Sequence, residues 1–498
     1  MAKKFDISRR TFLKIAGGGV VVLLGGGFLF RDQFLNDGNP SSTATDLIRG
    51  QRLPIPDLLT GRDVDGKRVY DLTMRQGSMT YVPGKQTATF AYNGDILGPT
   101  LLVHKGDDVV INVTNQLGEP TTTHWHGIHL PAVMDGGPHQ VIDHGETWQA
   151  QFTIKNEEAT FWYHPHPEGM TAEHVYAGLA GLFIVKDPES DLALPDRYGI
   201  DDIPLVVQDK IFNADGSFNY PGTNFGVKGD QILVNGVITP VFEAPAQVVR
   251  FRLLNGSNAR FYNFGFSDDR QFHQIGTDGG LLESPVPVTR LRLSNGERAE
   301  ILVDFSDQEG SQVQMVSFSS ELDGINPFWS SNAMDKSNFE IMTINVVSPT
   351  ANPTTAVPAF LATISRLREE QANRTRPFVL EMGFSGPMTI NGVSMDMDRI
   401  DQTVKVDETE IWEVTNSSDL PHPFHVHDVQ FLVLTRDGSP PAATEAGWKD
   451  TVLVMPRETV RIILQFSDYT DPDNPYMFHC HILEHEDAGM MGQFVVVA

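Results

Sequence analysis

Short runs of alternating apolar and polar residues, rich in β-branched and aromatic side chains, recur along the chain. Examples lie at residues 88–92, 109–113, 248–253 and 460–464. An alternation with a period of two turns one face of a strand toward a core, and glycine, asparagine, aspartate and proline break the runs. Many short strands at this spacing predict an all-β protein made of sandwiches or barrels.

A strand-like run ends in a similar way at three places. The sequences are Val-Thr-Asn at 113–115, Leu-Asn-Gly at 254–256 and Val-Thr-Asn at 414–416. These endings lie about 140 and 160 residues apart, which is the size of an ordinary domain. We interpret them as weak internal repetition of one β-domain.

The 498 residues are enough for three such domains. Turn-forming residues at 187–191 and a Pro/Thr/Ala stretch at 348–355 mark candidate boundaries. We predict domains over residues 46–190, 191–350 and 376–498. A linker over residues 351–375 joins the last two, and we expect a short helix within it, at residues 358–373.

The N-terminal residues have the pattern of an export signal. Residues 8–14, Ser-Arg-Arg-Thr-Phe-Leu-Lys, form a twin-arginine pattern, and a glycine-rich apolar run follows at 15–30. That run is short and glycine-rich for a spanning helix. We therefore predict a signal and flexible leader over residues 1–45, and export by the twin-arginine route to the periplasm, cell surface or extracellular space. Cleavage near residues 42–44 and an uncleaved anchor both stay open.

Charge and cysteine content narrow the partners. The chain has 37 basic and 64 acidic side chains, a net charge of −27, which repels a phosphate backbone and excludes nucleic acid as a partner. We ascribe the acidic surface mainly to solubility, and secondarily to attraction of cations, including metal ions. One cysteine cannot form an intrachain disulfide, which would suit a reducing compartment, but the export pattern contradicts that interpretation.

Ten of the 16 histidines fall into four clusters with spacings of two to four residues. Residues i and i+2 of a strand point the same way, so four pairs should each face one site. The eight imidazoles of these pairs belong to His124, His126, His164, His166, His425, His427, His479 and His481. They exceed the four ligands or fewer of a zinc site and suit a cluster of about three ions. The isolated His104, His129, His139, His144, His174 and His273 are interpreted as ordinary structural or surface residues.

Cys480 lies between His479 and His481 and should face the opposite side of the strand. It therefore belongs to a second metal site, for which the two remaining clustered histidines, His422 and His485, are available. A thiolate and two imidazoles with a weak axial thioether form the blue-copper arrangement. Met490 is the axial candidate, with Met491 adjacent. Copper fits this combination better than zinc or iron.

The four clusters resemble the signature of the multicopper oxidases, above all the bacterial spore-coat laccases and periplasmic cuprous oxidases, whose segment is similar to His-Cys-His-Ile-Leu-Glu-His-Glu-Asp-Ala-Gly-Met-Met at 479–491. The resemblance implies three cupredoxin-like domains, four coppers and four-electron reduction of dioxygen to water. It assigns His422, Cys480, His485 and Met490 to a type 1 copper. It assigns His124 and His425 to a type 2 copper, and a type 3 pair to His126, His164, His166, His427, His479 and His481.

The resemblance also bears on protons and on copper-free relatives. Asp135 and Glu486 match acidic residues that deliver protons for oxygen reduction in the family. The alternatives are an ordinary surface carboxylate for each residue, or a turn former for Asp135, which precedes two glycines. No ligand position is missing, which counts against the copper-free cell-division proteins of the same fold.

The substrate is less clearly encoded. We expect a monomeric, laccase-like oxidase of phenols and aromatic amines. The alternatives are a cuprous oxidase acting in copper tolerance and a copper-storage protein with incidental oxidase activity. The long methionine-rich insertion of cuprous oxidases is absent; Met395 and Met397 alternate with Asp396 and Asp398, and for these methionines packing is favoured over Cu(I) capture. A copper nitrite reductase would have no eight-histidine cluster.

Overall fold

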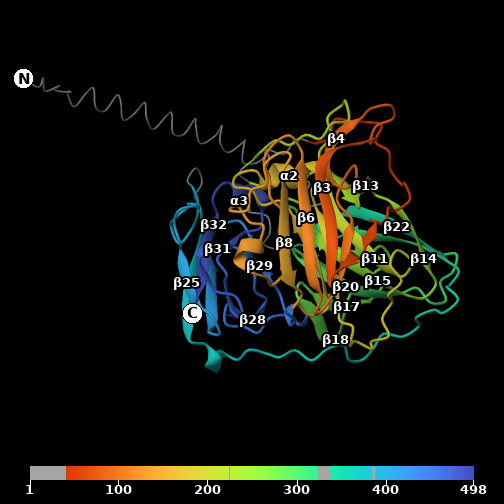
Figure 1. Ribbon diagram of the computed structural model, residues 1–498. Coiled ribbons are helices and arrows are strands. Elements are labelled where there is room, and N and C mark those ends of the chain that lie inside the picture. The colour runs from red at the N-terminus through yellow and green to blue at the C-terminus, as the bar shows by residue number, and fades with distance from the viewer. Residues whose placement is uncertain (1–40, 224, 323–336, 384–386) are drawn as a thin grey trace, which may run out of the picture.

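The structure, a computed structural model, describes residues 41–223, 225–322, 337–383 and 387–498 (Figure 1). Its strands form six sheets, two in each of three successive cupredoxin-like domains. The predicted all-β fold is confirmed, and the strand runs named above lie in four of its strands. The twin-arginine pattern lies outside the described residues, and the exact domain boundaries stay predictions.

The first domain contains the earliest histidines, and its two sheets enclose an apolar core around Trp125, Ile111 and Phe183. One sheet has the order β1 (Leu58–Leu59), β5 (Thr100–His104), β10 (Gly181–Lys186), β9 (Ala159–His164), β7 (His124–His126). The other has the order β2 (Arg62–Val64), β3 (Lys67–Met79), β6 (Asp108–Gln116), β8 (Thr147–Thr153), with β4 (Thr87–Tyr92) paired to β3.

The second domain, green in Figure 1, is built around Phe251, Phe264 and Ile301. Its larger sheet has the order β13 (Val237–Ile238), β12 (Gln231–Val234), β11 (Asp202–Lys210), β15 (Val248–Asn255), β20 (Arg298–Asp304), β17 (Phe272–Thr277), β18 (Gly280–Val288). Its smaller sheet has the order β14 (Val241–Pro245), β22 (Phe339–Val347), β21 (Gln312–Ser317), β16 (Tyr262–Phe266), β19 (Leu291–Leu293).

The third domain, blue in Figure 1, packs around Trp412, Phe378 and Phe478. One sheet has the order β24 (Met388–Ile390), β23 (Arg374–Met382), β26 (Thr409–Asn416), β30 (Thr459–Gln465), β28 (Phe431–Arg436). The other has the order β25 (Gln402–Lys405), β32 (Met491–Val497), β31 (Asp471–Cys480), β27 (His422–Val426), β29 (Thr451–Val454).

Helices are few and short in the described residues. The α-helices there are α2 (Thr171–Ala177) and α3 (Leu483–Asp487), which lie against each other near the histidines (Figure 1). Single 3-10 turns occur at Ala132–Met134, Ser319–Glu321, Glu369–Gln371 and Ala443–Glu445. No helix of the described ranges has the length and apolar character needed to cross a membrane.

The three similar strand endings have the same structural role in each domain. The side-chain amides of Asn115, Asn255 and Asn416 each donate to two backbone carbonyls, one four or five residues ahead and one more than 25 residues ahead. Their Oδ1 atoms each accept the backbone N–H two residues ahead. The predicted internal repetition is therefore present in the structure as one recurring corner.

Two sequence expectations are wrong. No helix forms at residues 358–373; the linker is extended apart from the turn Glu369–Gln371. Leu361 and Ile364 have helical spacing, but Leu361 packs into a core of the second domain and Ile364 into one of the third. A segment that joins two cores must stay extended.

The flexible leader is the second wrong expectation, as far as residues 41–45 are concerned. The Thr43 N–H donates to the Phe212 carbonyl at 2.8 Å, and just beyond the leader the Ile48 N–H donates to the Tyr81 carbonyl at the same distance. The polar composition resembles a leader, but these amides have backbone partners in the first two domains.

Candidate metal centre

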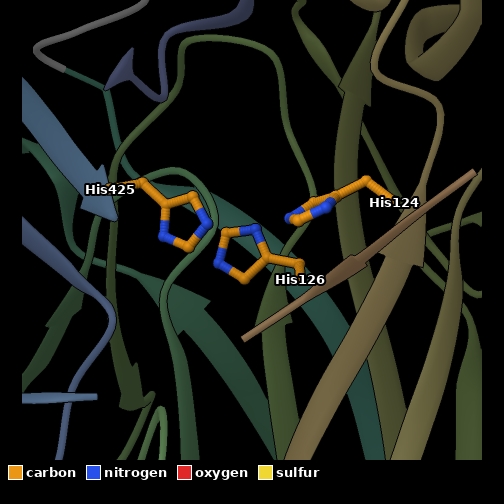
Figure 2. Close-up of side chains that lie close together, drawn as sticks. All are labelled: His124, His126 and His425. Carbon is orange, nitrogen blue, oxygen red and sulfur yellow. The ribbon is translucent and has the colours of Figure 1, made fainter. Parts of the chain in front are cut away.

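The eight paired histidines meet where β7 and β9 of the first domain face β27 and β31 of the third. Cross-strand register places His124 opposite His164 and His425 opposite His479. Figure 2 shows His124 and His126 from β7 turned toward His425 from β27. The rings of His126 and His425 stack with centroids 3.7 Å apart. The predicted gathering of the eight imidazoles is confirmed.

Within this gathering, possible ligand atoms converge in groups of three, with all atoms of a group within 4.8 Å of one another. The groups are His124/His126/His425, His126/His164/His481 and His166/His427/His479. Members of a pair can join different groups because His166, His427 and His481 follow the ends of their strands. The groups His126/His164/His481 and His166/His427/His479 share no residue, as expected for the ligands of a pair of ions. The remaining group, His124/His126/His425, would serve a third ion beside them.

Backbone carbonyls fix the orientation of several rings. The Nδ1 atoms of His124, His164 and His425 donate to the carbonyls of Asp135, Pro165 and Asp450 at 2.8–2.9 Å. The Nε2 atoms of these three histidines are buried and have no hydrogen-bond partner. Buried polar atoms are normally satisfied, and a ring held by one nitrogen presents the other to a metal. The donor set therefore fits bound metal ions.

Burial favours the neutral, metal-binding form of several of these imidazoles. Burial, reinforced by neighbouring histidines, lowers the pKa of His126, His164, His425 and His427 well below the ordinary value. Burial likewise lowers the pKa of His481 to about 3. A neutral imidazole keeps a lone pair for a metal. Eight buried rings without a bound cation would leave most of these lone pairs unused.

Cys480 forms a second site on the other side of β31, as predicted. Its Sγ lies 3.4 Å from Nδ1 of His422 and 3.6 Å from Nδ1 of His485, and the two nitrogens are 3.1 Å apart. Burial raises the pKa of the Cys480 thiol and lowers that of His422 to about 3. A buried thiol loses its proton only beside a cation, so this triad fits a thiolate-binding metal.

The axial candidate lies beside this triad. The Met490 carbonyl accepts the Cys480 N–H at 3.0 Å, and the Met490 N–H donates to the His485 carbonyl at 2.9 Å. Met490 is completely buried. Met491 instead lines a separate surface pocket with Val393. The backbone thus favours Met490 over its neighbour.

Asp135 lies in the histidine cluster. Its Oδ2 accepts a hydrogen bond from Nδ1 of His427 at 2.8 Å, and its Oδ1 lies 3.4 Å from Nδ1 of His124. The next residue, Gly136, has φ +75°, and an added Cβ there would lie 1.7 Å from the Thr123 carbonyl oxygen. Both the turn interpretation and the site interpretation of Asp135 therefore apply, because the glycine turn is what brings the carboxylate to the cluster.

Glu486 also lies against the histidine cluster. Its two oxygens are each 3.2 Å from an imidazole Nδ1, one of His166 and the other of His479. Burial alone would raise the pKa of Glu486, but the two facing histidines hold it below its ordinary value. Asp135 and Glu486 are both buried, so the alternative of an ordinary surface carboxylate is wrong for each.

Two polar residues that contact the clustered histidines could not be predicted from the sequence. Ser418 Oγ lies 2.8 Å from Nε2 of His422. Asp450 Oδ1 lies 3.0 Å from Nε2 of His126. Neither residue shares the two-residue spacing that reveals the histidines. The isolated histidines are outside all the convergent groups, as expected; His129, for example, lies between Asp428 and Asp468.

A set of eight buried imidazoles beside a thiolate site with two further imidazoles favours copper. Soft thiolate and thioether ligands with two imidazoles select copper, whereas the hard ligands of calcium or magnesium are absent from the triad. The peptide of Cys480 joins the two sites, since His479 and His481 belong to two of the three-histidine groups. This arrangement can take in single electrons at one site and use them at the other.

Comparison with known proteins agrees with these observations. Two family profiles described as multicopper oxidase match residues 73–190 and 335–498. The chain is 37% identical over 447 residues to the multicopper oxidase mco of Staphylococcus haemolyticus, covering 87% of this chain and 90% of that one. It is also 35% identical to the cell division protein FtsP of Photorhabdus laumondii, covering 89% and 92%.

Solved structures show the same similarity. A laccase from Pediococcus acidilactici superposes with a TM-score of 0.82 at 36% identity, covering 92% of this chain and 96% of that one. The laccase-like multicopper oxidase CueO from an Ochrobactrum species superposes with a TM-score of 0.81 at 35% identity, covering 89% and 100%. The chain therefore belongs to the multicopper oxidase family, the copper-dependent oxidoreductases that use oxygen as acceptor.

Proposed function

We propose that this chain is a laccase-like oxidase that removes single electrons from phenols and aromatic amines and uses four of them to reduce dioxygen to water. The observation that carries the proposal is the position of Cys480. Its sulfur lies in the triad with His422 and His485, while its sequence neighbours lie in two of the three-histidine groups. A few covalent bonds thus connect electron entry with oxygen reduction.

The proposed ligand sets follow these groups. His422, Cys480, His485 and Met490 would hold a type 1 copper, and His124 with His425 would hold a type 2 copper. Two sets of three, His126/His164/His481 and His166/His427/His479, would hold the type 3 pair; the convergence of their nitrogens supports this division. When bound, the coppers would supply one-electron storage and the binding and reduction of dioxygen.

Protons must reach the buried cluster for water to form. In this proposal Asp135 and Glu486 hold them, at the carboxylate oxygens that face His427, His166 and His479. A carboxylate that touches imidazole Nδ1 atoms can also keep those rings oriented with Nε2 toward the metal. The two roles predict different kinetic effects.

Oxygen consumption tests the proposed function. The copper-loaded protein should be blue and should consume oxygen with a dimethoxyphenol, without accumulating peroxide, because four electrons are delivered together. An oxygen electrode with a peroxide assay measures both, and the metal-free protein is the control. Copper-loaded protein that consumes no oxygen with any phenol or with Cu(I) would contradict the enzyme and favour a copper-binding role or a role like that named for the FtsP relative.

Cuprous oxidation is a second candidate because of one contact. The N–H of Met395 donates to the Gly489 carbonyl at 3.0 Å, which sets the segment containing Met395 and Met397 against the residue before Met490. Both methionines are half-buried, and Asp396 and Asp398 between and after them are exposed. Thioethers are suitable ligands for Cu(I), and here they lie next to the proposed type 1 site.

Leucine at positions 395 and 397 should distinguish the two substrates. If these thioethers capture Cu(I), the double variant Met395→Leu, Met397→Leu lowers kcat/KM for Cu(I) by about 10-fold and leaves that for a phenol unchanged, since leucine keeps the packing volume. Parallel oxygen-electrode kinetics with the two substrates measure this. Met382→Leu, at the end of β23, is the matched control. Equal Cu(I) kinetics in variant and parent protein would restrict the methionines to packing.

We also propose that the protein is exported by the twin-arginine route and acts in the periplasm, at the cell surface or outside the cell. The Ser-Arg-Arg-Thr-Phe-Leu-Lys sequence at residues 8–14 supports this proposal. Fractionation of cells that express the full chain tests it; protein confined to the cytoplasm would contradict it.

A further inference from the structure

A turn of the second domain lies against the copper cluster, although that domain contributes none of the proposed ligands. The turn joins β19 (Leu291–Leu293) to β20 (Arg298–Asp304). Gly296 within it has φ +78°, and a Cβ there would lie 2.8–3.0 Å from three atoms of the His481 ring. Glycine therefore allows the turn to cover one face of this imidazole.

Arg298, at the end of the same turn, uses its whole guanidinium. Nη1 and Nη2 each donate to one oxygen of Asp450, the Nη1 bond being 2.8 Å long. Nε donates to the Thr160 carbonyl at 3.1 Å, and Nη1 also donates to the Gly296 carbonyl at 2.7 Å. The side chains of Arg298 and Asp450 are completely buried. A bidentate arginine–carboxylate pair of this kind fixes both the position of the carboxylate and the orientation of its plane.

Asp450 in turn holds two of the proposed ligands. Its Oδ1 lies 3.0 Å from Nε2 of His126, and its backbone carbonyl accepts from Nδ1 of His425 at 2.8 Å. Nδ1 of His126 is buried without a hydrogen-bond partner, and His126 belongs to the group with His164 and His481. His126 is thus held by Nε2, the reverse of His124, His164 and His425.

We propose that Arg298 is a positioning residue for the copper cluster. It fixes the Asp450 carboxylate, which selects the His126 tautomer with hydrogen on Nε2 and leaves Nδ1 for the metal; its turn also holds Gly296 against His481. Two of the three rings in the group His126/His164/His481 are therefore set by the second domain. This inference rests on the proposed function, because it takes that group to hold one copper of the pair.

The substitution Arg298→Lys tests the inference. Lysine keeps the positive charge but cannot bind a carboxylate in a bidentate way. Loss of such outer contacts typically costs about 10–100-fold in metal affinity or activity. The variant should keep the visible thiolate–copper band and its KM for a phenol. It should lose copper from the cluster, the near-ultraviolet band of the coupled pair, and about 10–100-fold in kcat.

Arg250→Lys is the matched control. Arg250 in β15 is also buried and also forms ion pairs with carboxylates, Glu300 of its own domain and Glu158 of the first. Its guanidinium is bound to these two glutamates and not to a residue that holds a clustered histidine, so its variant should keep copper content and both bands. If the Arg298 and Arg250 variants do not differ in copper content, spectrum and kcat, the inference is overturned.

A double variant separates positioning from general stability. Arg298→Met alone leaves the Asp450 charge unpaired and should lower the melting temperature. Adding Asp450→Leu removes that charge, so the melting temperature should recover while copper content and the near-ultraviolet band stay low. If the near-ultraviolet band recovers together with the melting temperature, Arg298 only stabilises the fold through its ion pair, and the inference is overturned.

Failure of the proposed function gives a different result. If the parent protein itself lacks both absorption bands, the proposed function is contradicted. The inference is then decided by titrating metal-free protein with Cu(I): the parent chain must bind more ions than the Arg298→Lys variant, and equal stoichiometry overturns it.

Discussion

Replacing Cys480 by serine is expected to give a colourless protein whose oxidation of phenols falls to the level of metal-free protein. The intense blue of such a site comes from a thiolate bound to copper with two imidazoles, and Cys480 is the chain's one cysteine. Its sulfur also begins the covalent path to His479 and His481. The substitution therefore removes colour and electron entry together. Visible absorption and oxygen uptake measure the two losses.

The Cys480→Ser variant should remain folded and keep the other metal site. Cys480 is completely buried beside Phe424 and Met490 in the core of the third domain, and serine is smaller and more polar. The variant should still bind copper at the eight histidines and keep the near-ultraviolet band of a coupled pair. Ser418→Ala is the matched control; it removes the hydroxyl beside Nε2 of His422 but no proposed ligand, and should stay blue. A blue Cys480→Ser protein would refute the assignment.

The sequence was sufficient to predict that the histidines gather because strand geometry enforces a short repeat. Histidines two residues apart must share a side of a strand, and Cys480 between two of them must face away. The structure shows both features. Strand alternation alone does not separate the members of a pair into different groups, because that depends on where β9, β27 and β31 end. Strand ends are set by cross-strand partners rather than by local pattern.

Residues that contact each other between domains have no comparable spacing pattern in the sequence. Arg298 and Asp450 are 152 residues apart in sequence, and each alone resembles an ordinary charged residue next to a strand. The helix predicted in the linker was wrong for a related reason. Leu361 and Ile364 have the spacing of one helix face, yet they enter different cores. Periodicity cannot reveal which core receives a side chain.

The three corner asparagines show what a weak repeat can still predict. Sequence similarity between the domains is reduced to a few residues around Asn115, Asn255 and Asn416, but the hydrogen bonds of these side chains are equivalent. A buried amide with two donors and one acceptor in use cannot be replaced by most side chains. Such a position persists in the pattern after the apolar residues around it have diverged.

Replacing Glu486 by glutamine is expected to lower kcat for oxygen reduction by about 100- to 10,000-fold, the usual contribution of a positioned proton donor. Glutamine keeps the size of the side chain and a contact to His166 and His479, but it cannot release a proton. The Glu486 carboxylate faces His166 and His479 and not the proposed type 1 ligands, so a phenol should still bleach the blue band under nitrogen as fast as in the parent protein. Stopped-flow absorption measures bleaching and reoxidation separately, and a solvent deuterium isotope effect should appear on reoxidation.

Three further variants decide whether this effect reflects a proton or merely ring orientation. Asp487→Asn is the matched control: this neighbouring half-buried carboxylate accepts the backbone N–H groups of Thr171 and Ala172 at 2.9 Å, so its loss affects a helix start and should leave reoxidation fast. Asp135→Asn should slow reoxidation as Glu486→Gln does, because Asp135 meets the cluster at His427. Glu486→Asp restores a proton with a shorter reach and should recover part of the rate. If glutamine at 486 leaves reoxidation unchanged, or if aspartate recovers nothing while copper content is complete, proton delivery by Glu486 is refuted and the carboxylate only orients the imidazoles.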